Sequence, residues 1–240
     1  MSTQAPKHGS ETVADRLAIA WHGQSLELCA DRAMYAPDHS TLYVADTHFG
    51  KPEHFRGAGR PVPEDVTGCD LDRLSLLLTE TGARRLVVLG DLFHAPVPAD
   101  GETVRALRAW RDERPDVAVV LVPGNHDRRA SAAISALELE VLDQPVVDGA
   151  FELRHEPPSD AEAGERPVLC GHLHPAVRLR RPGRRAGAGA GMRVACCWLG
   201  ERVCVLPAFG RFTGCRVIEP GARDRVFAVG EGTPIEVSLA

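Results

Sequence analysis

Short runs of apolar, mostly β-branched residues recur along the chain, and polar residues follow each run. Four of these runs cover residues 42–45, 86–89, 117–122 and 168–170. Runs of this length and composition are typical of strands buried inside a sheet. The polar residues that follow them are therefore expected in loops at strand ends, where a rigid sheet can hold them around one point.

Segments with helical spacing separate the first three of these strands. Apolar residues recur every three or four positions in residues 63–81 and 101–114, which predicts two helices with one buried face each. Gly82 and Pro115 are the predicted ends of these helices. A third, short helix is predicted over residues 131–139. The alternation of strands and helices predicts parallel strands joined by right-handed crossovers.

Strands dominate the remainder of the chain. A hairpin is predicted over residues 17–29 with Gly23 in its turn, followed by a short strand at 33–35. The strands predicted after the third helix are 141–147, 151–154, 176–179, 192–199, 202–206, 216–218 and 225–229. Residues 49–63 are rich in Gly, Pro and Arg, and they are predicted to form an irregular loop.

Residues 1–16 lack hydrophobic periodicity and any apolar stretch, so we expect a mobile N-terminal tail and no signal peptide. Residues 17–240 are expected to form a single domain, because a chain of 240 residues buries a full core without disulfides. No stretch approaches the length of a membrane span. The seven cysteines form no C-x-x-C pair and are expected to be reduced, as in a cytoplasmic protein.

Overall composition is that of a globular protein, with 44% hydrophobic and 25% charged residues. The net charge of -5 argues weakly against a general nucleic-acid binder. Arginines nevertheless gather in residues 178–193, which predict a flexible basic loop between two strands. Two interpretations of this loop stay open, namely contact with a nucleic-acid backbone and a solvated hairpin tip.

The polar residues at the four strand ends are of the kinds that bind divalent metals. They are Asp46, His48, Asp91, Asn125, His172 and His174. Six ligands exceed what one tetrahedral catalytic metal holds while keeping a position open for water, so two ions are predicted. Asp91 lies in the sequence between Asp46 and His48 on one side and Asn125 and His172 on the other, and it is the predicted bridge between the two ions. Manganese is the first expectation, while iron, zinc and magnesium are also compatible with these ligands.

A glycine precedes a ligand at three of these strand ends, at Gly90, Gly124 and Gly171. A sharp turn and a close approach of the backbone are expected there, because a Cβ atom would obstruct both. The absence of cysteine from the four segments argues against a structural zinc cluster.

The order Asp-x-His, Gly-Asp, Gly-Asn-His-Asp, Gly-His-x-His resembles that of the calcineurin-like metallophosphoesterase superfamily. Connecting residues 44–51, 55–63, 171–175 and 206–214 are similar to the ligase-associated DNA damage response endonuclease family called PdeM. The resemblance covers roughly residues 17–218. It implies an α/β fold, a two-sheet αββα sandwich with the active site at the C-terminal ends of the strands.

The resemblance also implies roles for individual residues. His155 would complete the second metal site, and His126 would stabilise or protonate the leaving oxygen. The implied ligands are Asp46, His48, Asp91 and His174 for one ion, and Asp91, Asn125, His155 and His172 for the other. From the residues alone, His126 could instead orient a ligand through a bond to Asp127. His94 could support the bridging carboxylate or make a structural hydrogen bond.

The implied reaction is hydrolysis of a phosphoester in DNA or RNA, by a nuclease or an end-processing phosphatase with Asp91 and His126 as catalytic residues. The resemblance also implies a role in DNA repair together with a DNA ligase and a helicase. An alternative is a small-molecule phosphodiesterase or phosphomonoesterase, which the acidic net charge and the lack of an aromatic stacking platform favour. A scaffold that has lost its metals is disfavoured, because all seven ligands are present.

Basic residues near the motifs are candidates for binding substrate phosphate or for a solvated surface. They are Lys51, His54, Arg56, Arg60, Arg128 and Arg129. The sequence does not indicate the oligomeric state, the polarity of a nucleic-acid end or the natural substrate.

Overall fold

The computed structural model describes residues 16–57, 59, 65–159, 162, 164–179, 191–230 and 232–238. The predicted N-terminal tail lies outside the described residues except for Arg16, which is the first residue of β1. The arginine-rich segment lies outside them from residue 180 to residue 190. In the part of the chain that is described, no helix is long and apolar enough to span a membrane.

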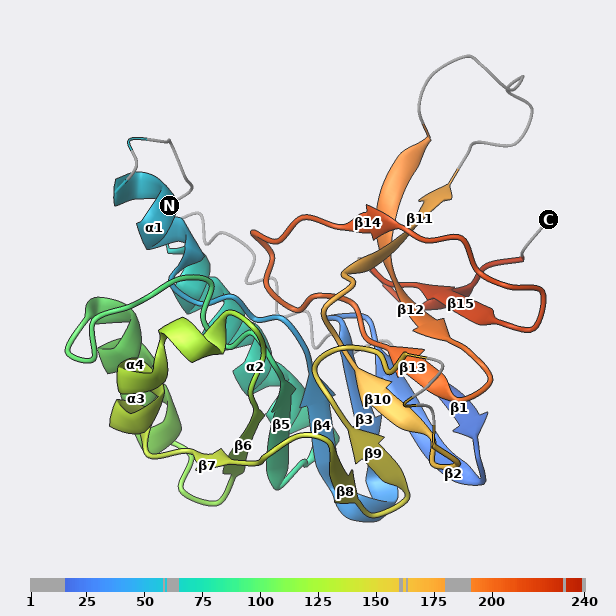
Figure 1. Ribbon diagram of the computed structural model, residues 1–240, viewed down its shortest axis with the longest axis horizontal. Coiled ribbons are helices and arrows are strands. Elements are labelled where there is room, and N and C mark those ends of the chain that lie inside the picture. The colour runs from blue at the N-terminus through green and yellow to red at the C-terminus, as the bar shows by residue number, and fades with distance from the viewer. Residues whose placement is uncertain are drawn as a thin grey trace, which may run out of the picture.

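Seven strands form the first sheet in their chain order (Figure 1). They are β1 (Arg16–Trp21), β2 (Gln24–Cys29), β3 (Ala33–Ala36), β4 (Thr41–Val44), β5 (Arg85–Leu89), β6 (Ala118–Val122) and β7 (Glu140–Val141). Strands β1 to β4 pair antiparallel, and β4 to β7 pair parallel. The predicted hairpin is confirmed, with His22 and Gly23 in its turn at positive φ.

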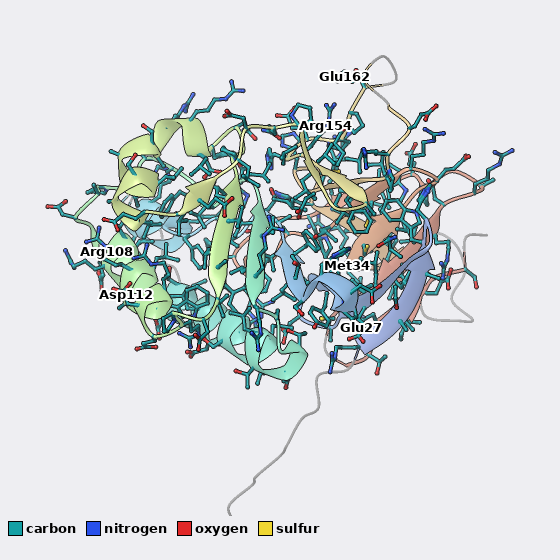
Figure 2. The ribbon with its side chains drawn as sticks, turned by 90° about the horizontal axis from the view of Figure 1, so that it is seen from below. Glu27, Met34, Arg108, Asp112, Arg154 and Glu162 are labelled. Atoms are coloured by element: carbon teal, nitrogen blue, oxygen red, sulfur yellow. The ribbon has the colours of Figure 1, made fainter. Side chains whose placement is uncertain are left out.

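Helices cover one face of this sheet, as Figure 1 shows. They are α2 (Val66–Thr81), α3 (Glu102–Asp112) and α4 (Ser131–Leu137), and 3-10 turns η1 (Pro37–His39) and η2 (Asp127–Arg129) lie between elements. α2 begins later than predicted, where the Asp65 side chain accepts a hydrogen bond from the Gly68 N–H, and it ends at Gly82 as predicted. In α3, Arg108 and Asp112 point away from the sheet (Figure 2).

Nine strands form the second sheet. They are β8 (Val146–Asp148), β9 (Phe151–Leu153), β10 (Val168–Cys170), β11 (Pro175–Leu179), β12 (Met192–Leu199), β13 (Val203–Val205), β14 (Arg216–Val217), β15 (Arg225–Ala228) and β16 (Ile235–Glu236). The order is β14-β11-β12-β13-β10-β9-β8, with β15 on β12 and β16 on β15. β11 and β12 extend from the body as a hairpin (Figure 1). The two-residue strand β16 is too short to give a pattern in the sequence.

Two apolar layers hold these elements together, and the strands of the first sheet contribute to both. In β5, Val88 packs toward the helices, while Val87 and Leu89 pack toward the second sheet. Side chains alternate between the faces of a strand, so a strand buried on both faces is apolar throughout. Met34 lies in the layer between the sheets (Figure 2). The two-sheet α/β sandwich is thus confirmed, although the described residues contain no helix beyond Leu137.

Two predictions of local structure are wrong. Residues 51–57 form helix α1 (Lys51–Gly57) inside the predicted irregular loop. Proline is tolerated in the first turn of a helix because its missing N–H has no intrahelical partner there. Residues 141–147 were predicted as one strand, but they divide between β7 and β8, which belong to different sheets. Pro145 cannot donate to a strand ladder, and the chain crosses between the sheets at this point.

A buried ion-pair network joins α2 to the segment after β13. The Arg73 guanidinium lies 2.7 Å from Asp70 Oδ1 and 3.0 Å from Asp31 Oδ1. It also donates to the Phe209 carbonyl at 3.1 Å and stacks over the Phe209 ring at 4.2 Å. Asp70 in turn accepts a hydrogen bond from the Arg211 N–H at 3.2 Å. Both charges are paired and hydrogen-bonded, which is the condition for burying them.

Replacing Arg73 by Met is expected to lower the free energy of unfolding by about 3–5 kcal/mol, because it leaves the Asp70 carboxylate buried without its partner. Urea unfolding followed by circular dichroism measures this change. The matched control is Arg16→Met, which removes a partly exposed pair with Glu27 and should cost about 0–1 kcal/mol. Equal stability of the two variants would show that the buried network contributes nothing.

Candidate metal centre

Backbone hydrogen bonds bring the four motif segments to one edge of the sandwich. The Asp46 N–H donates to the Gly90 carbonyl at 3.1 Å, and the His48 N–H donates to the Asp91 carbonyl at 2.9 Å. The Gly171 N–H donates to the His155 carbonyl at 2.9 Å. The His126 N–H, in the segment after β6, donates to Asp91 Oδ1 at 2.9 Å. The motif segments follow β4, β5, β6 and β10, and His155 follows β9, so the expected convergence at the ends of strands is present in both sheets.

One group of possible metal ligands consists of Asp46, His48 and His174, whose ligand atoms all lie within 4.8 Å of one another. His174 Nε2 is 3.3 Å from Asp46 Oδ1 and 3.3 Å from His48 Nε2. The Nδ1–H of His174 donates to the Gly214 carbonyl at 3.1 Å. A carbonyl can only accept, so this bond leaves the lone pair of His174 on Nε2, facing the other two ligands.

A second group consists of Asp46, Asp91 and His155, with the same 4.8 Å limit on its ligand atoms. The Nδ1–H of His155 donates to the Leu89 carbonyl at 3.1 Å, so its lone pair is on Nε2. That atom lies 3.5 Å from Asp91 Oδ1 and 3.0 Å from Asn125 Oδ1. His155 is fully buried. A nitrogen lone pair facing two acceptor oxygens suits a cation between them.

All seven residues predicted as ligands are therefore parts of one connected cluster. His172 joins it through Nδ1, which lies 3.1 Å from His155 Nε2. Asp91 faces both groups, because its Oδ2 is 3.9 Å from His48 Nε2 while its Oδ1 approaches His155. Asp46 also contributes to both groups, which the spacing of the motifs did not indicate. The distribution of ligands between two ions and the bridging role of Asp91 stay predictions.

The electrostatics of the cluster favour a cation. Burial raises the pKa of the Asp91 carboxyl, although the nearby His155 opposes this change. Burial, together with the neighbouring His174 and Lys51, lowers the pKa of His48 to about 2, so its imidazole is neutral, the form that binds metals. Asp46 Oδ1 is buried and accepts no hydrogen bond. An unpaired buried carboxylate oxygen is costly, and a divalent ion would satisfy it.

The backbone at the cluster is held in an unusual conformation. Five of the predicted ligands have positive φ, between 47° and 70°: Asp46, His48, Asp91, His172 and His174. Residues other than glycine seldom adopt this conformation, and they do so mainly where surrounding contacts impose it. The sequence gives no sign of this strain.

All three glycines make the predicted close approach. An added Cβ at Gly171 would lie only 2.6 Å from the Asp46 carboxylate. An added Cβ at Gly90, which itself has φ of +78°, would collide with the His155 ring. An added Cβ at Gly124 would collide with the Asp91 carboxylate. All three positions therefore require glycine because a ligand side chain fills the space beside the backbone.

His126 stands at the mouth of the cluster, with 39% of its side chain exposed. Its Nδ1–H donates to the His94 carbonyl at 2.6 Å, which leaves Nε2 toward Asp91 Oδ2 at 3.9 Å. The alternative bond to Asp127 is not formed. Asp127 is buried and accepts hydrogen bonds from the backbone N–H groups of Phe93 and Gly124. It therefore fixes the loop that carries His126, a role that the sequence did not indicate.

Aromatic side chains gather next to His126, contrary to the expectation that no stacking platform exists. The rings of His54, Phe55, His94 and Phe212 lie in contact with one another. They come from α1, the segment after β5 and the segment after β13. Because these residues come from three segments that are separated in the sequence, no sequence pattern indicated that they form a cluster.

The basic residues predicted near phosphate have different outcomes. Burial lowers the pKa of His94 to about 4, and the positive charge of the nearby Lys51 contributes to this change. Arg128 and Arg129 are exposed in η2, next to the His126 loop. Arg60 lies outside the described residues. Contact of any of them with phosphate stays a prediction.

Comparisons with known proteins place these features in context. No protein-family model matches the chain, and a search of curated proteins finds no match. Among solved structures, the chain is similar to the nuclease MPE of Pseudomonas putida, with 36% identity, a TM-score of 0.77, and coverage of 92% of this chain and 100% of that chain. Yfce, a phosphoesterase from E. coli, is similar at 16% identity and a TM-score of 0.43, over 83% of this chain and 99% of that chain.

Proposed function

Because this chain belongs to the metallophosphoesterase family of the nuclease MPE, we propose that it cleaves phosphodiester bonds in DNA or RNA. As a member of this family it is a metal-dependent phosphoester hydrolase. The observation that carries the proposal is the buried cluster in which Asp46 Oδ1, without a hydrogen-bond donor, faces three imidazoles and a second carboxylate. Such a donor set fits divalent ions and has no purpose in an apolar core.

Different residues of the site have different roles in hydrolysis. When bound, divalent ions supply Lewis-acid activation of water and offset charge on the phosphate. Water adds to phosphorus as the ester P–O bond breaks, and the leaving oxygen takes the Nε2 proton of His126 in its imidazolium form, which carries N–H on both nitrogens. The proton that the attacking water gives up to solvent balances the one that His126 recovers from solvent afterwards. The bond from His126 Nδ1–H to the His94 carbonyl fixes the ring so that Nε2 faces this oxygen. Asp91 and Asp46 hold the positive charge near the phosphate.

Finer assignments rest on the resemblance to the PdeM family in residues 44–51 and 206–214. We infer two ions, with manganese as the first expectation and iron, zinc or magnesium as compatible alternatives. We further infer a role in DNA repair together with a DNA ligase and a helicase, and a cytoplasmic location. Processing of phosphorylated ends is included in this proposal.

The proposal is tested by offering one enzyme preparation several phosphoesters. Protein stripped of metal and then supplied with Mn²⁺ would be incubated with bis-p-nitrophenyl phosphate, p-nitrophenyl phosphate, and oligonucleotides with free or phosphorylated ends. We expect cleavage of the diester and of the oligonucleotides. Cleavage of the monoester alone would identify a small-molecule phosphatase. Tight binding of Mn²⁺ without cleavage of any ester would identify a scaffold.

A further inference from the structure

We propose that the aromatic cluster beside His126 is a binding site for a nucleobase of the substrate. This cluster, the aromatic wall, consists of His54, Phe55, His94 and Phe212. The inference rests on the proposed function, because it assumes a nucleic-acid substrate, and it adds a site that the metal chemistry does not require. It also assigns that site to one side of the scissile bond.

The wall extends directly from the predicted proton donor. The His94 ring stacks on His126 with centroids 5.3 Å apart and planes 19° apart. Phe55 stacks on His94 at 6.1 Å and 22°. Phe212 meets Phe55 edge to face at 5.8 Å, and His54 lies 5.8 Å from His94. Nearly parallel rings therefore lead away from the site of reaction.

The wall is partly open to solvent and held in place from behind. His54 is exposed, while Phe55, His94 and Phe212 are half-buried. Single exposed apolar residues are ordinary, but four rings gathered at the mouth of a polar site mark a binding surface. The segment that carries Phe212 is anchored through Arg73 to α2, as described above. The wall is thus formed before substrate arrives, which lowers the entropic cost of binding.

Nucleobases are the ligands that such a wall suits within a nucleic acid. Every base has a flat face that stacks on aromatic side chains, and this contact does not depend on sequence. The wall begins at His126, which donates its proton to the leaving oxygen in the proposed reaction. The stacked base therefore belongs to the nucleoside that departs with that oxygen. Lys51, the first residue of α1, adds positive charge near His94.

The test uses a thymidine dinucleotide, which contains one phosphodiester bond, and two analogues that lack the base of one nucleoside or the other. Analysis of the products shows which nucleoside departs and which retains the phosphate. For the wild type, removing the base of the departing nucleoside should lower kcat/KM about tenfold, whereas removing the other base should leave it nearly unchanged.

Phe55→Ala should lower kcat/KM about tenfold on the full dinucleotide and have little effect on the analogue that lacks the departing base. Phe55→Trp should retain the preference, since it keeps a stacking surface. Phe212→Ala changes a different segment and should give the same base-dependent loss if Phe55→Ala does not fold. Metal content should remain that of the wild type in all three variants.

Equal losses on the full dinucleotide and on the base-free analogue would overturn the inference and make the wall a structural support. A preference for the base of the retained nucleoside would also overturn it. In both cases the dinucleotide is still cleaved, so the proposed function survives. Cleavage of nitrophenyl esters without cleavage of any dinucleotide would reject the nucleic-acid function, and the inference with it.

Discussion

Replacing Asp91 by Asn is expected to remove more bound metal and more activity than replacing any predicted ligand that faces a single group. Asp91 faces both ligand groups, with its two oxygens 3.9 Å from His48 Nε2 and 3.5 Å from His155 Nε2. The change removes the negative charge shared by two cations that repel each other. Activity should fall more than about 100-fold, since even the supports of metal ligands account for 10–100-fold effects.

Metal content measured by mass spectrometry and turnover of a phosphodiester test this prediction together. The matched comparisons are Asn125→Ala and His172→Ala, which we expect to weaken one ion and to leave part of the metal bound. Asp91→Asn has nearly the same shape as the wild type, so a folded variant is expected. Near-normal metal content and turnover in this variant would reject the bridging role.

Replacing His126 by Ala is expected to leave metal content unchanged and to lower kcat about 10²–10⁴-fold, the usual contribution of a positioned proton donor. The reason is that His126 Nε2 stands at the partly exposed mouth of the cluster, while Nδ1–H is held by the His94 carbonyl. Single-turnover kinetics on the dinucleotide separates this loss from slower product release.

The control for this variant is His22→Ala, which alters an exposed histidine in the β1–β2 turn and should change neither quantity. Loss of metal from His126→Ala would reassign His126 as a ligand. Retention of full activity on an ester with a good leaving group, and loss on the dinucleotide, would support proton donation, because only a poor leaving group needs it.

The main elements of the fold could be predicted because local and global requirements agree. β5 is apolar throughout because Val87 and Leu89 face one core and Val88 faces the other. The end of α2 could be predicted because helices commonly end at a glycine in the left-handed conformation, as α2 does at Gly82. Six of the predicted ligands could be located because each follows such a strand, and the glycines beside them leave space for ligand side chains. His155 could be located only through the resemblance to the superfamily.

The errors arise where tertiary contacts or chain direction override local composition. α1 forms in a segment rich in glycine, proline and arginine, where sequence preference is weak. β7 and β8 are close together in the sequence, but Pro145 separates them and they join different sheets. The composition of a segment describes that segment alone, whereas the formation of α1 and the separation of β7 from β8 depend on the elements packed against them.

The aromatic wall and the strained ligand backbone could not be predicted for a related reason. Phe55 and Phe212 are far apart in the sequence and neither belongs to a motif, so only the packing of α1 against the segment after β13 brings them together. Similarly, Asp46 and His48 have positive φ where their N–H groups donate to the neighbouring Gly90 and Asp91 segment. Both features depend on contacts between elements.

The central claim is that seven side chains from five loops hold two divalent ions that act on a phosphodiester. Titration of metal-stripped protein with Mn²⁺, with diester hydrolysis and bound metal measured on the same samples, tests it most directly. The account predicts that activity is absent without metal and reaches its plateau when two ions are bound to each chain. Activity that survives complete removal of metal, or that is full with a single bound ion, would contradict it.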